Sequence, residues 1–414
     1  MGLISGVVER LVQPLAVRVL LARERRESGV AYDLTSAEVR EDPYPTYHEL
    51  RRIDPVHRLR LVDAWVLTRY RDVEAVLRDH RRFGNAGRIL VETVPMSLLG
   101  LDPPEHTRLR ALVSKAFTPR AVAMLRTHIE ETTAHLLDAV AGTNRFDLMA
   151  ALAYPLPVTI IAEMLGVRPG DRDRFEEWSD SLALSVDPLV SRGQVHRIKN
   201  AAEEAYAYFE TIIDERRRRP REDLVSALLA AEEEGDRLTH EELLSTMLLI
   251  LMAGHETTRN LIGNGMLALL RNPHQMQRLR SDPELLDSAI DELLRYDSPG
   301  QLNGRCARED VELGGKRIPA GDVVISVIGA ANRDPEVFDD PDTLDIGRRE
   351  ESHLSFGRGI HYCLGAPLAV LEARIVFAAV LDRFASIRLA AEPRHRKTVV
   401  LRGVEHLWIE VERA

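Results

Sequence analysis

The sequence predicts a mainly helical α+β fold with small β-sheets near its two ends. Helical periodicity fills almost all of residues 119–218, and a long apolar segment with the same period follows Thr239. Alternating or β-branched segments are confined to residues 56–68, 301–326 and 398–409. Apolar residues recur at roughly every third or fourth position in a helix but at every second position in a strand, so the two kinds of segment can be separated.

The N-terminal part combines an extension with the first helix and hairpin. Residues 1–35 are expected to form an extension whose amphipathic helix packs on the rest of the chain, with a membrane-surface anchor as the alternative. No uncharged apolar run reaches the roughly 18 residues that a membrane span needs, so no integral span is predicted. Pro43 and Pro45 begin a helix, and the alternation within 56–61 and 64–68 predicts a β-hairpin.

A further helix is expected to begin near Asp102, a candidate N-cap that is followed by Pro103 and Glu105. His106 and Arg110 are four positions apart, so they share one face of this helix. Two hydrogen-bond donors on one face suit a carboxylate partner, since arginine binds carboxylates in bidentate fashion. A solvated, charged helix face is the alternative interpretation.

The long apolar helix opens with a capping box, Thr239 and Glu242, and is expected to cross the interior. In its middle, Gly254 weakens the helix and removes a side chain where a flat ligand could approach. Glu256 and Thr257 follow, and burying an unpaired acid is costly. Two interpretations stay open: a locally bent helix that holds a water chain for protons, or a structural role. In the second, Thr257 bonds to the preceding turn and Glu256 pairs with a basic residue.

A glycine-rich loop near the end of the chain carries Cys363 to the start of an apolar helix over residues 368–381. Gly357, Gly359 and Gly365 permit tight turns and a close approach of backbone to something flat. Free amides at a helix N-terminus lower the pKa of a thiol, so Cys363 is a candidate soft ligand for iron. The alternative is a small buried hydrophobic residue.

Composition excludes some classes of partner. The formal net charge is −10, which argues against nucleic-acid binding because phosphate recognition needs a basic face. The two cysteines, Cys306 and Cys363, provide no disulfide framework, which favours a reducing, cytoplasmic compartment.

Four motifs in one consistent order resemble those of the cytochrome P450 family. Phe356-Gly-x-Gly-x-His-x-Cys-x-Gly365 is similar to its haem-binding signature, and Ala253-Gly-x-Glu-Thr-Thr258 to its oxygen-activation motif. Glu292-x-x-Arg295 resembles its structural clamp, and Asp102-Pro-Pro-x-His-x-x-x-Arg110 its propionate-binding helix. The resemblance covers roughly residues 40–410. It implies a single cytochrome P450 domain over 1–414, with haem b between the long central helix and the cysteine-led helix.

The resemblance also implies roles for individual residues. Cys363 would be the axial thiolate ligand, Glu256 would relay protons, and Thr257 would stabilise dioxygen at the haem. His255 fills the variable position of its motif, so we expect no catalytic role for it, only a packing or surface position. Further residues implied to contact the cofactor are His106, Arg110, Ala253, Arg305, Phe356, Gly357, Arg358, His361 and Gly365. The clamp would join Glu292, Arg295 and Arg348, and the expected substrate pocket contains Ile89, Leu90, Val94, Met96, Leu98, Leu249, Leu302, Val399 and Val400.

The activity implied is that of a bacterial haem-thiolate monooxygenase, which inserts one oxygen atom from dioxygen into a hydrophobic small molecule. Hydroxylation and epoxidation are both compatible with it. Electrons would come from a separate ferredoxin and its reductase, with Arg108, Lys115 and Arg358 as candidate docking residues. The alternatives are a peroxide-driven haem-thiolate peroxygenase and a non-catalytic haem protein that senses gas or recruits a partner.

Overall fold

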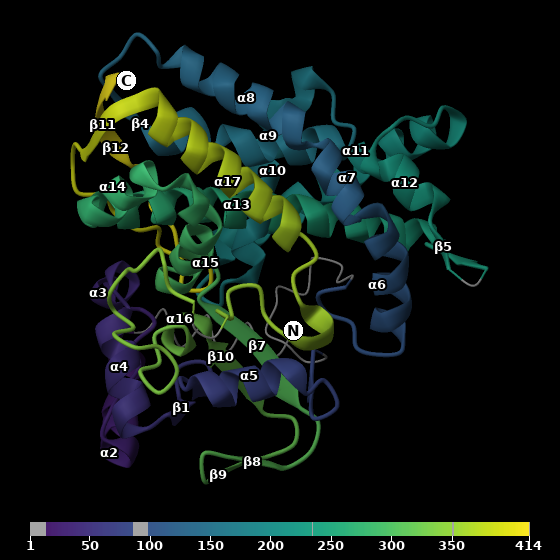
Figure 1. The fold of residues 1–414 in the computed structure, drawn as a ribbon. Coiled ribbons are helices and arrows are strands. Elements are labelled where there is room, and N and C mark those ends of the chain that lie inside the picture. The colour runs from purple at the N-terminus through teal and green to yellow at the C-terminus, as the bar shows by residue number, and fades with distance from the viewer. Residues whose placement is uncertain (1–13, 86–97, 234, 350–351, 414) are drawn as a thin grey trace.

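The computed structural model describes residues 14–85, 98–233, 235–349 and 352–413 and shows a thick layer of helices beside a smaller, sheet-containing part (Figure 1). The α-helices are α2 (Pro14–Ser28), α3 (Ala37–Glu41), α4 (Tyr44–Ile53), α5 (Tyr70–Arg78), α6 (Glu105–Ala116), α7 (Pro119–Met124), α8 (Arg126–Ala139), α9 (Pro155–Met164), α10 (Arg172–Ala183), α11 (Arg192–Arg218), α12 (Leu224–Ala230), α13 (His240–Arg271), α14 (Pro273–Ser281), α15 (Leu286–Tyr296), α16 (Ile328–Ala331) and α17 (Ala366–Arg383). Short 3-10 or π turns lie at Met149–Ala153, Pro169–Asp171, Leu184–Val186, Pro283–Leu285 and Gly359–His361.

The largest described sheet has five strands in the order β1-β2-β10-β7-β3. A second sheet has the order β11-β12-β4, and the pairs β5-β6 and β8-β9 stand apart from both. The strands are β1 (Val56–Leu59), β2 (Ala64–Leu67), β3 (Phe83–Gly84), β4 (Arg145–Asp147), β5 (Glu232–Glu233), β6 (Asp236–Arg237), β7 (Leu302–Ala307), β8 (Val311–Leu313), β9 (Lys316–Ile318), β10 (Val323–Val327), β11 (Phe384–Leu389) and β12 (Trp408–Arg413). The predicted mainly helical fold with small sheets is therefore confirmed.

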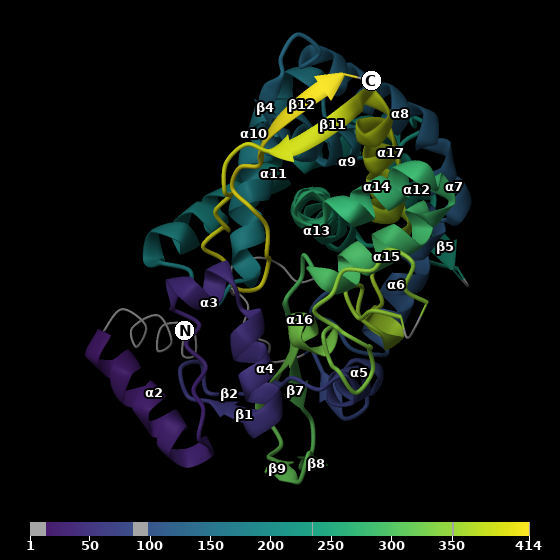
Figure 2. The same cartoon turned by 60° about the vertical axis from the view of Figure 1, so that its left-hand side comes forward.

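Helix α13 is the centre of the helical layer, as Figure 2 shows in a view nearly along its axis. Its 32 residues form one unbroken helix, and the capping box of Thr239 and Glu242 closes its N-terminus as predicted. Gly263 and Gly265 allow close packing within the core: a Cβ would lie 2.6 Å from the sulfur of Met149 at the first and 2.7 Å from Cζ of Phe377 at the second. These neighbours bury nearly the whole length of the helix.

The N-terminal part is a smaller unit built on the sheet. The predicted hairpin is present, with Val56 opposite Leu67 and Leu59 opposite Ala64 in an antiparallel pair. Helix α2 packs on it through a buried acid: Glu24 accepts from the amides of Tyr32 at 3.0 Å and Arg60 at 2.6 Å. No helix in the described residues is long and apolar enough to cross a membrane.

Two sequence-based expectations of local structure are wrong: the N-cap at Asp102 and a strand at residues 398–401. Helix α6 begins at Glu105 without a side-chain cap. Asp102 instead accepts from the Asn85 amide at 2.9 Å and pairs with Arg308, so its carboxylate is engaged elsewhere. The segment 311–318 forms a separate hairpin and does not join the main sheet. Residues 398–401 form no strand, because side-chain and irregular backbone contacts replace ladder pairing there.

Candidate functional site

The loop before α17 holds Cys363 by its backbone. Gly357 and Gly359 have φ angles of 72° and 70°, which favour glycine, and a Cβ at Gly359 would lie 2.9 Å from the carbonyl oxygen of Leu77. The Cys363 amide donates to the Phe356 carbonyl at 2.9 Å. Gly365 has an ordinary φ of −82°, so no turn requires it, but an added Cβ would meet no heavy atom within 4 Å. The loop therefore leaves open space beside the cysteine.

Two opposing effects act on the pKa of the Cys363 thiol. Burial raises the pKa of its thiol, whereas the amides of Gly365 and Ala366 and the charge of Arg110 lower it. The predicted effect of the helix N-terminus is present, yet burial outweighs it, so a thiolate here needs a further positive charge. Cys306 has no helix N-terminus beside it, and its sulfur lies 3.4 Å from the carbonyl oxygen of Gly321.

Cationic and imidazole groups from separate segments meet near this loop. His106 of α6 is only 1% exposed, and neither of its ring nitrogens has a hydrogen-bond partner among the described residues. Its ring centroid lies 4.0 Å from that of His361, whose Nε2 lies 2.7 Å from Nδ2 of Asn85. Burial lowers the pKa of His106, and the charges of Arg110 and Arg305 lower it further. The cluster of His106, Arg110 and Arg305 therefore favours the binding of an anion and disfavours protonation of His106.

Helix α13 crosses the core, but a short stretch on one of its faces is accessible. Ala253 is exposed and Thr257, one turn later, is half-buried, although most of their neighbours on the helix are buried. The Thr257 hydroxyl donates to the Ala253 carbonyl at 2.7 Å, so the predicted bond to the preceding turn is present. Gly254 does not face this space: its Cβ would lie 2.6 Å from Cδ1 of Ile161. The expectation that Gly254 makes room for a ligand is therefore wrong, because the glycine makes room for α9.

Glu256 lies in a buried polar network and is only 2% exposed. It pairs with Arg396, which is 140 positions further along the chain. It also contacts Arg259 at 3.3 Å and accepts from the Asn260 amide group at 3.2 Å. A second acid, Asp180 of α10, has a carboxylate oxygen within 4.8 Å of one on Glu256. The basic partner that the sequence left open is thus Arg396 together with Arg259.

His255, between these residues, is fully buried and takes a packing position. Its Nδ1 lies 2.9 Å from the Ser179 hydroxyl, and its ring packs edge-on against Tyr154. Burial lowers the pKa of His255 to about 4. The ring is therefore neutral near pH 7, which fits the packing role expected from the sequence.

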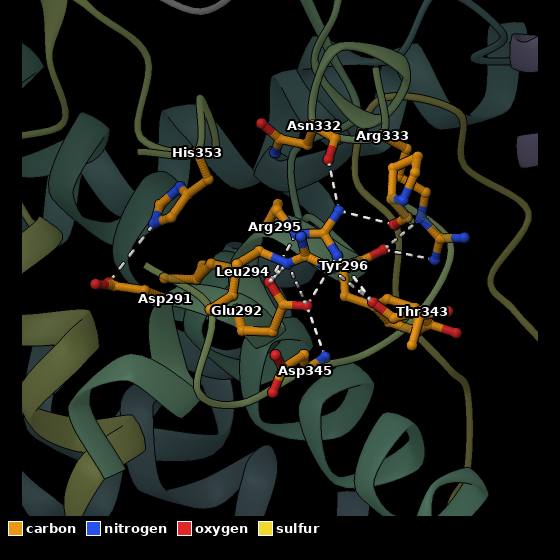
Figure 3. A network of polar contacts seen from close by, with 12 residues as sticks. Asp291, Glu292, Leu294, Arg295, Tyr296, Asn332, Arg333, Thr343, Asp345 and His353 are labelled. Atoms are coloured by element: carbon orange, nitrogen blue, oxygen red, sulfur yellow. Dashed lines mark hydrogen bonds and ion pairs between the residues drawn. The ribbon is translucent and has the colours of Figure 1, made fainter. Parts of the chain in front are cut away.

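The three clamp residues meet in a buried cluster, shown in part in Figure 3. Arg295 donates to Glu292 through two nitrogens, at 2.6 and 2.8 Å, and to the carbonyls of Asn332 and Pro341, both at 2.8 Å. Arg348 reaches Glu292 at 3.3 Å. Each charge therefore has several partners, which offsets the cost of burial.

A surface hollow of about 680 Å³ lies beside the cysteine loop and the clamp. Its lining includes Arg348, Arg349, Arg358, Phe356 and Tyr362. Arg349 is exposed, and Arg358 donates to the Ser352 carbonyl at 2.8 Å. Arg358 also has one long contact with a carboxylate, that of Glu74 at 3.8 Å, whereas Arg108 is paired closely with both Asp236 and Glu242. The sequence singled out Arg358 but missed Arg349, since no motif marks an exposed arginine.

The expected substrate-pocket residues are divided between two apolar clusters. Ile89, Leu90, Val94 and Met96 lie outside the described residues. Leu98 belongs to the main helical core, and Leu249 packs against that core. Val399 belongs to the cluster on the N-terminal sheet, with Leu302 and Val400 packed against it.

Comparisons with known proteins agree with this geometry. The cytochrome P450 family model matches residues 51–401. Cytochrome P450 107B1 of Saccharopolyspora erythraea is 43% identical over 91% of this chain and 96% of the relative. Cytochrome P450 monooxygenase PikC of Streptomyces venezuelae is 44% identical over 85% of this chain and 86% of the relative. The solved structure of CYP109E1 from Bacillus megaterium in complex with testosterone is 38% identical, has a TM-score of 0.82, and matches 90% of this chain and 99% of that one.

The fold and these relatives define a haem-thiolate monooxygenase. The chain belongs to the cytochrome P450 family, whose members bind haem b. The described residues fit that cofactor: His106 offers two unpartnered ring nitrogens beside Arg110 and Arg305, which suits propionates. The exposed Ala253 and the open space at Gly365 leave room for a flat group, and Cys363 offers a soft ligand for its iron.

Proposed function

We propose that this monooxygenase oxidises a hydrophobic small molecule by hydroxylation or epoxidation, with electrons from a separate ferredoxin. The observation that carries the proposal is the face of α13 at Ala253 and Thr257, a hydroxyl and open surface inside an otherwise buried helix. Leu249 continues this face one turn earlier. The apolar side chains of Leu302, Val399 and Val400 support an apolar substrate. The testosterone complex of a relative supports the same class of molecule.

In the proposed mechanism, Cys363 would ligate the iron, while His106, Arg110 and Arg305 would bind the propionates. Phe356, Gly357, Arg358, His361 and Gly365 would form the cradle around the cysteine. The haem, when bound, supplies the redox chemistry that activates dioxygen.

Thr257 would donate a hydrogen bond to the dioxygen, which requires its hydroxyl to leave the Ala253 carbonyl. Glu256 would bring protons from the Asp180 side of α13, where a half-exposed carboxylate faces solvent. Because Glu256 is held by Arg396 and Arg259, it must loosen at least one of these pairs to move a proton.

The hollow beside the cysteine loop is the proposed docking surface for the ferredoxin. An acidic partner would meet Arg349 and Arg358 there, close to the chain that carries Cys363. Lys115 of α6 is exposed and is kept as a further candidate. Arg108 is less suited, since two carboxylates already neutralise it.

Both cysteines are free thiols, which supports a reducing compartment such as the cytoplasm.

Two variants test the proposed chemistry in the haem-loaded enzyme with ferredoxin, its reductase and a nicotinamide cofactor. Glu256→Ala and Thr257→Ala should each lower the rate of product formation about 100-fold, because the first removes proton delivery and the second removes the hydrogen bond to dioxygen. Thr258→Ala is the matched control, since Thr258 is buried on another face of the same helix and should change the rate little. Undiminished product formation by both site variants would contradict the mechanism. Turnover with hydrogen peroxide alone, and none with dioxygen and ferredoxin, would instead indicate a peroxygenase.

The substrate class can be tested without turnover. A library of steroids, terpenoids, fatty acids and macrolide precursors would be screened for shifts of the haem absorption, which report displacement of the water ligand. Val399→Arg should weaken every apolar binder, since it buries a charge in the proposed lining. If charged, water-soluble compounds bound more tightly than the apolar ones, the proposed substrate class would be wrong.

A further inference from the structure

The irregular segment 395–402 contacts two parts of the molecule that are far apart in sequence, near residue 41 and near residues 297–301. At one end, Nδ1 of His395 lies 2.8 Å from Glu41, the last residue of α3. At the other end, Arg402 donates to Asp297 at 2.8 Å, at the end of α15. Between them, the Val400 carbonyl accepts from the Gln301 amide at 2.8 Å, immediately before β7. The segment is thus anchored at both ends, and between them it contacts Asp187 and Glu256.

Asp187 holds the middle of this segment by hydrogen bonds to its backbone. Its Oδ2 accepts from the amides of Val399 at 2.7 Å and Val400 at 3.4 Å, and its Oδ1 accepts from Leu189 at 2.9 Å. Asp187 is 5% exposed, and it forms no ion pair within the part of the chain that the structure describes. A buried carboxylate with only amide donors depends on all of them, because losing one leaves charge without compensation.

Asp187 belongs to the link between α10 and α11, not to the segment that it holds. It follows the 3-10 turn Leu184–Val186, and the next helix begins at Arg192. If this link moved away, its carboxylate would move with it, and the Val399 and Val400 amides would lose their acceptor. The position of the link therefore fixes Val399 and Val400, which belong to the proposed substrate lining.

The same segment holds Glu256 from the other side. Arg396 lies three positions before Val399, and its guanidinium pairs with the Glu256 carboxylate. The Arg396 amide donates to the Gly403 carbonyl at 2.9 Å, so the backbone beside this side chain is also fixed. Along the chain, the contact of Val399 with Asp187 and the contact of Arg396 with Glu256 are thus only three positions apart.

We propose that Asp187 and Arg396 are positioning residues that connect the link 184–191 to Glu256 through segment 395–402. The link fixes Val399 and Val400 through Asp187, and this sets the position from which Arg396 pairs with Glu256. A substrate that contacts Val399 and Val400 then also affects the pair that holds Glu256. Proton delivery is thus matched to substrate occupancy, which limits the loss of reducing equivalents as hydrogen peroxide. This inference rests on the proposed role of Glu256.

Hydrogen exchange of the haem-loaded protein tests the connection without turnover. Asp187→Ala should increase amide exchange about threefold or more in residues 396–401. Arg396→Gln should do the same in residues 185–190, which Arg396 does not contact, because coupling between two sites is reciprocal. Asp187→Asn, which keeps one acceptor oxygen, should give an intermediate increase and serves if the alanine variant does not fold.

Asp147→Ala is the matched control. Asp147 also accepts two backbone amides, from Met149 at 3.0 Å and Leu407 at 2.8 Å, but it lies outside the proposed connection. It should increase exchange near residue 407 and leave 185–190 unchanged. Unchanged exchange in 185–190 for Arg396→Gln, or in 396–401 for both Asp187 variants, would overturn the proposal.

A second measurement separates this proposal from the proposed function. In the enzyme with its electron donors, Asp187→Ala and Arg396→Gln should each raise the peroxide released per nicotinamide oxidised. The double variant should be no worse than the poorer single variant, because both act through one segment. If the two effects multiply, the connection is wrong even where the monooxygenase mechanism holds. If no variant or wild-type protein makes product from dioxygen, the proposed function fails while the exchange result still stands.

Discussion

The cysteine side and the threonine side of the site are held together in different ways. On the cysteine side, α15, α17 and residues 354–365 form contacts within short motifs: Glu292 meets Arg295 three positions later, and Cys363 bonds to Phe356. On the threonine side, Glu256 of α13 depends on Arg396, which is 140 positions away. The first side contains key contacts that local spacing sets, whereas the main partner of Glu256 on the second side comes from a distant part of the chain.

This difference suits the two tasks that we assign to them. An axial ligand must stay in one place, and a clamp whose charges are all paired within a buried cluster resists movement. A proton carrier must change partners, and a carboxylate shared between Arg396 and Arg259 has more than one arrangement available. The predictions below test whether the cysteine side is the more rigid one, and whether substitutions there lose more stability and cofactor than substitutions elsewhere.

The largest effect is expected from breaking the clamp. Arg295→Ala leaves the buried Glu292 carboxylate without its main partner, so we expect a loss of about 3–5 kcal/mol in the free energy of unfolding. Denaturant unfolding of the haem-loaded protein would measure it. The exposed pair of Arg278 and Asp345 is the matched control, and Arg278→Ala should cost less than about 1 kcal/mol. Equal losses for the two variants would contradict the assignment of rigidity to the cysteine side.

A smaller effect is expected at the propionate anchors. His106→Phe keeps the ring shape but removes both unpartnered nitrogens, so haem should leave the protein about 10-fold faster. Transfer of haem to an excess of apomyoglobin measures that rate. His255→Phe is the control, since His255 is equally buried but packs against Tyr154 and Ser179. Faster haem loss in the control alone would show that His106 does not anchor the cofactor.

The smallest effect is a pH dependence within α17. Glu372 is 1% exposed, and burial raises its pKa to about 8. Between its ordinary pKa of 4.5 and about 8, the folded protein holds a proton that the unfolded chain releases, so this group makes stability fall as pH rises. Glu372→Gln should therefore be more stable than wild type at pH 8, with the gain shrinking by up to about 1.4 kcal/mol per pH unit towards pH 5. A gain independent of pH would show that Glu372 is not protonated in the fold.

The contacts of the cysteine side could be predicted from the sequence more completely than those of the threonine side, and the reason is physical. Short spacings such as that of Glu292 and Arg295 are set by helix geometry, so a motif reports a contact directly. The partner of Glu256 has no such spacing, and nothing in the sequence distinguishes Arg396 from other arginines. Gly254 was misjudged for a related reason, because a glycine that admits Ile161 and one that admits a ligand look alike in sequence.

The central claim is that Cys363 is the thiolate ligand of a haem, and the carbon monoxide spectrum of the reduced protein tests it most directly. Wild type should give the thiolate-type band. Cys363→Ala should abolish this band, and Cys306→Ala should leave it unchanged, because Cys306 lies on β7 without a helix N-terminus beside it. Retention of the band in Cys363→Ala, or its loss in Cys306→Ala, would contradict the account.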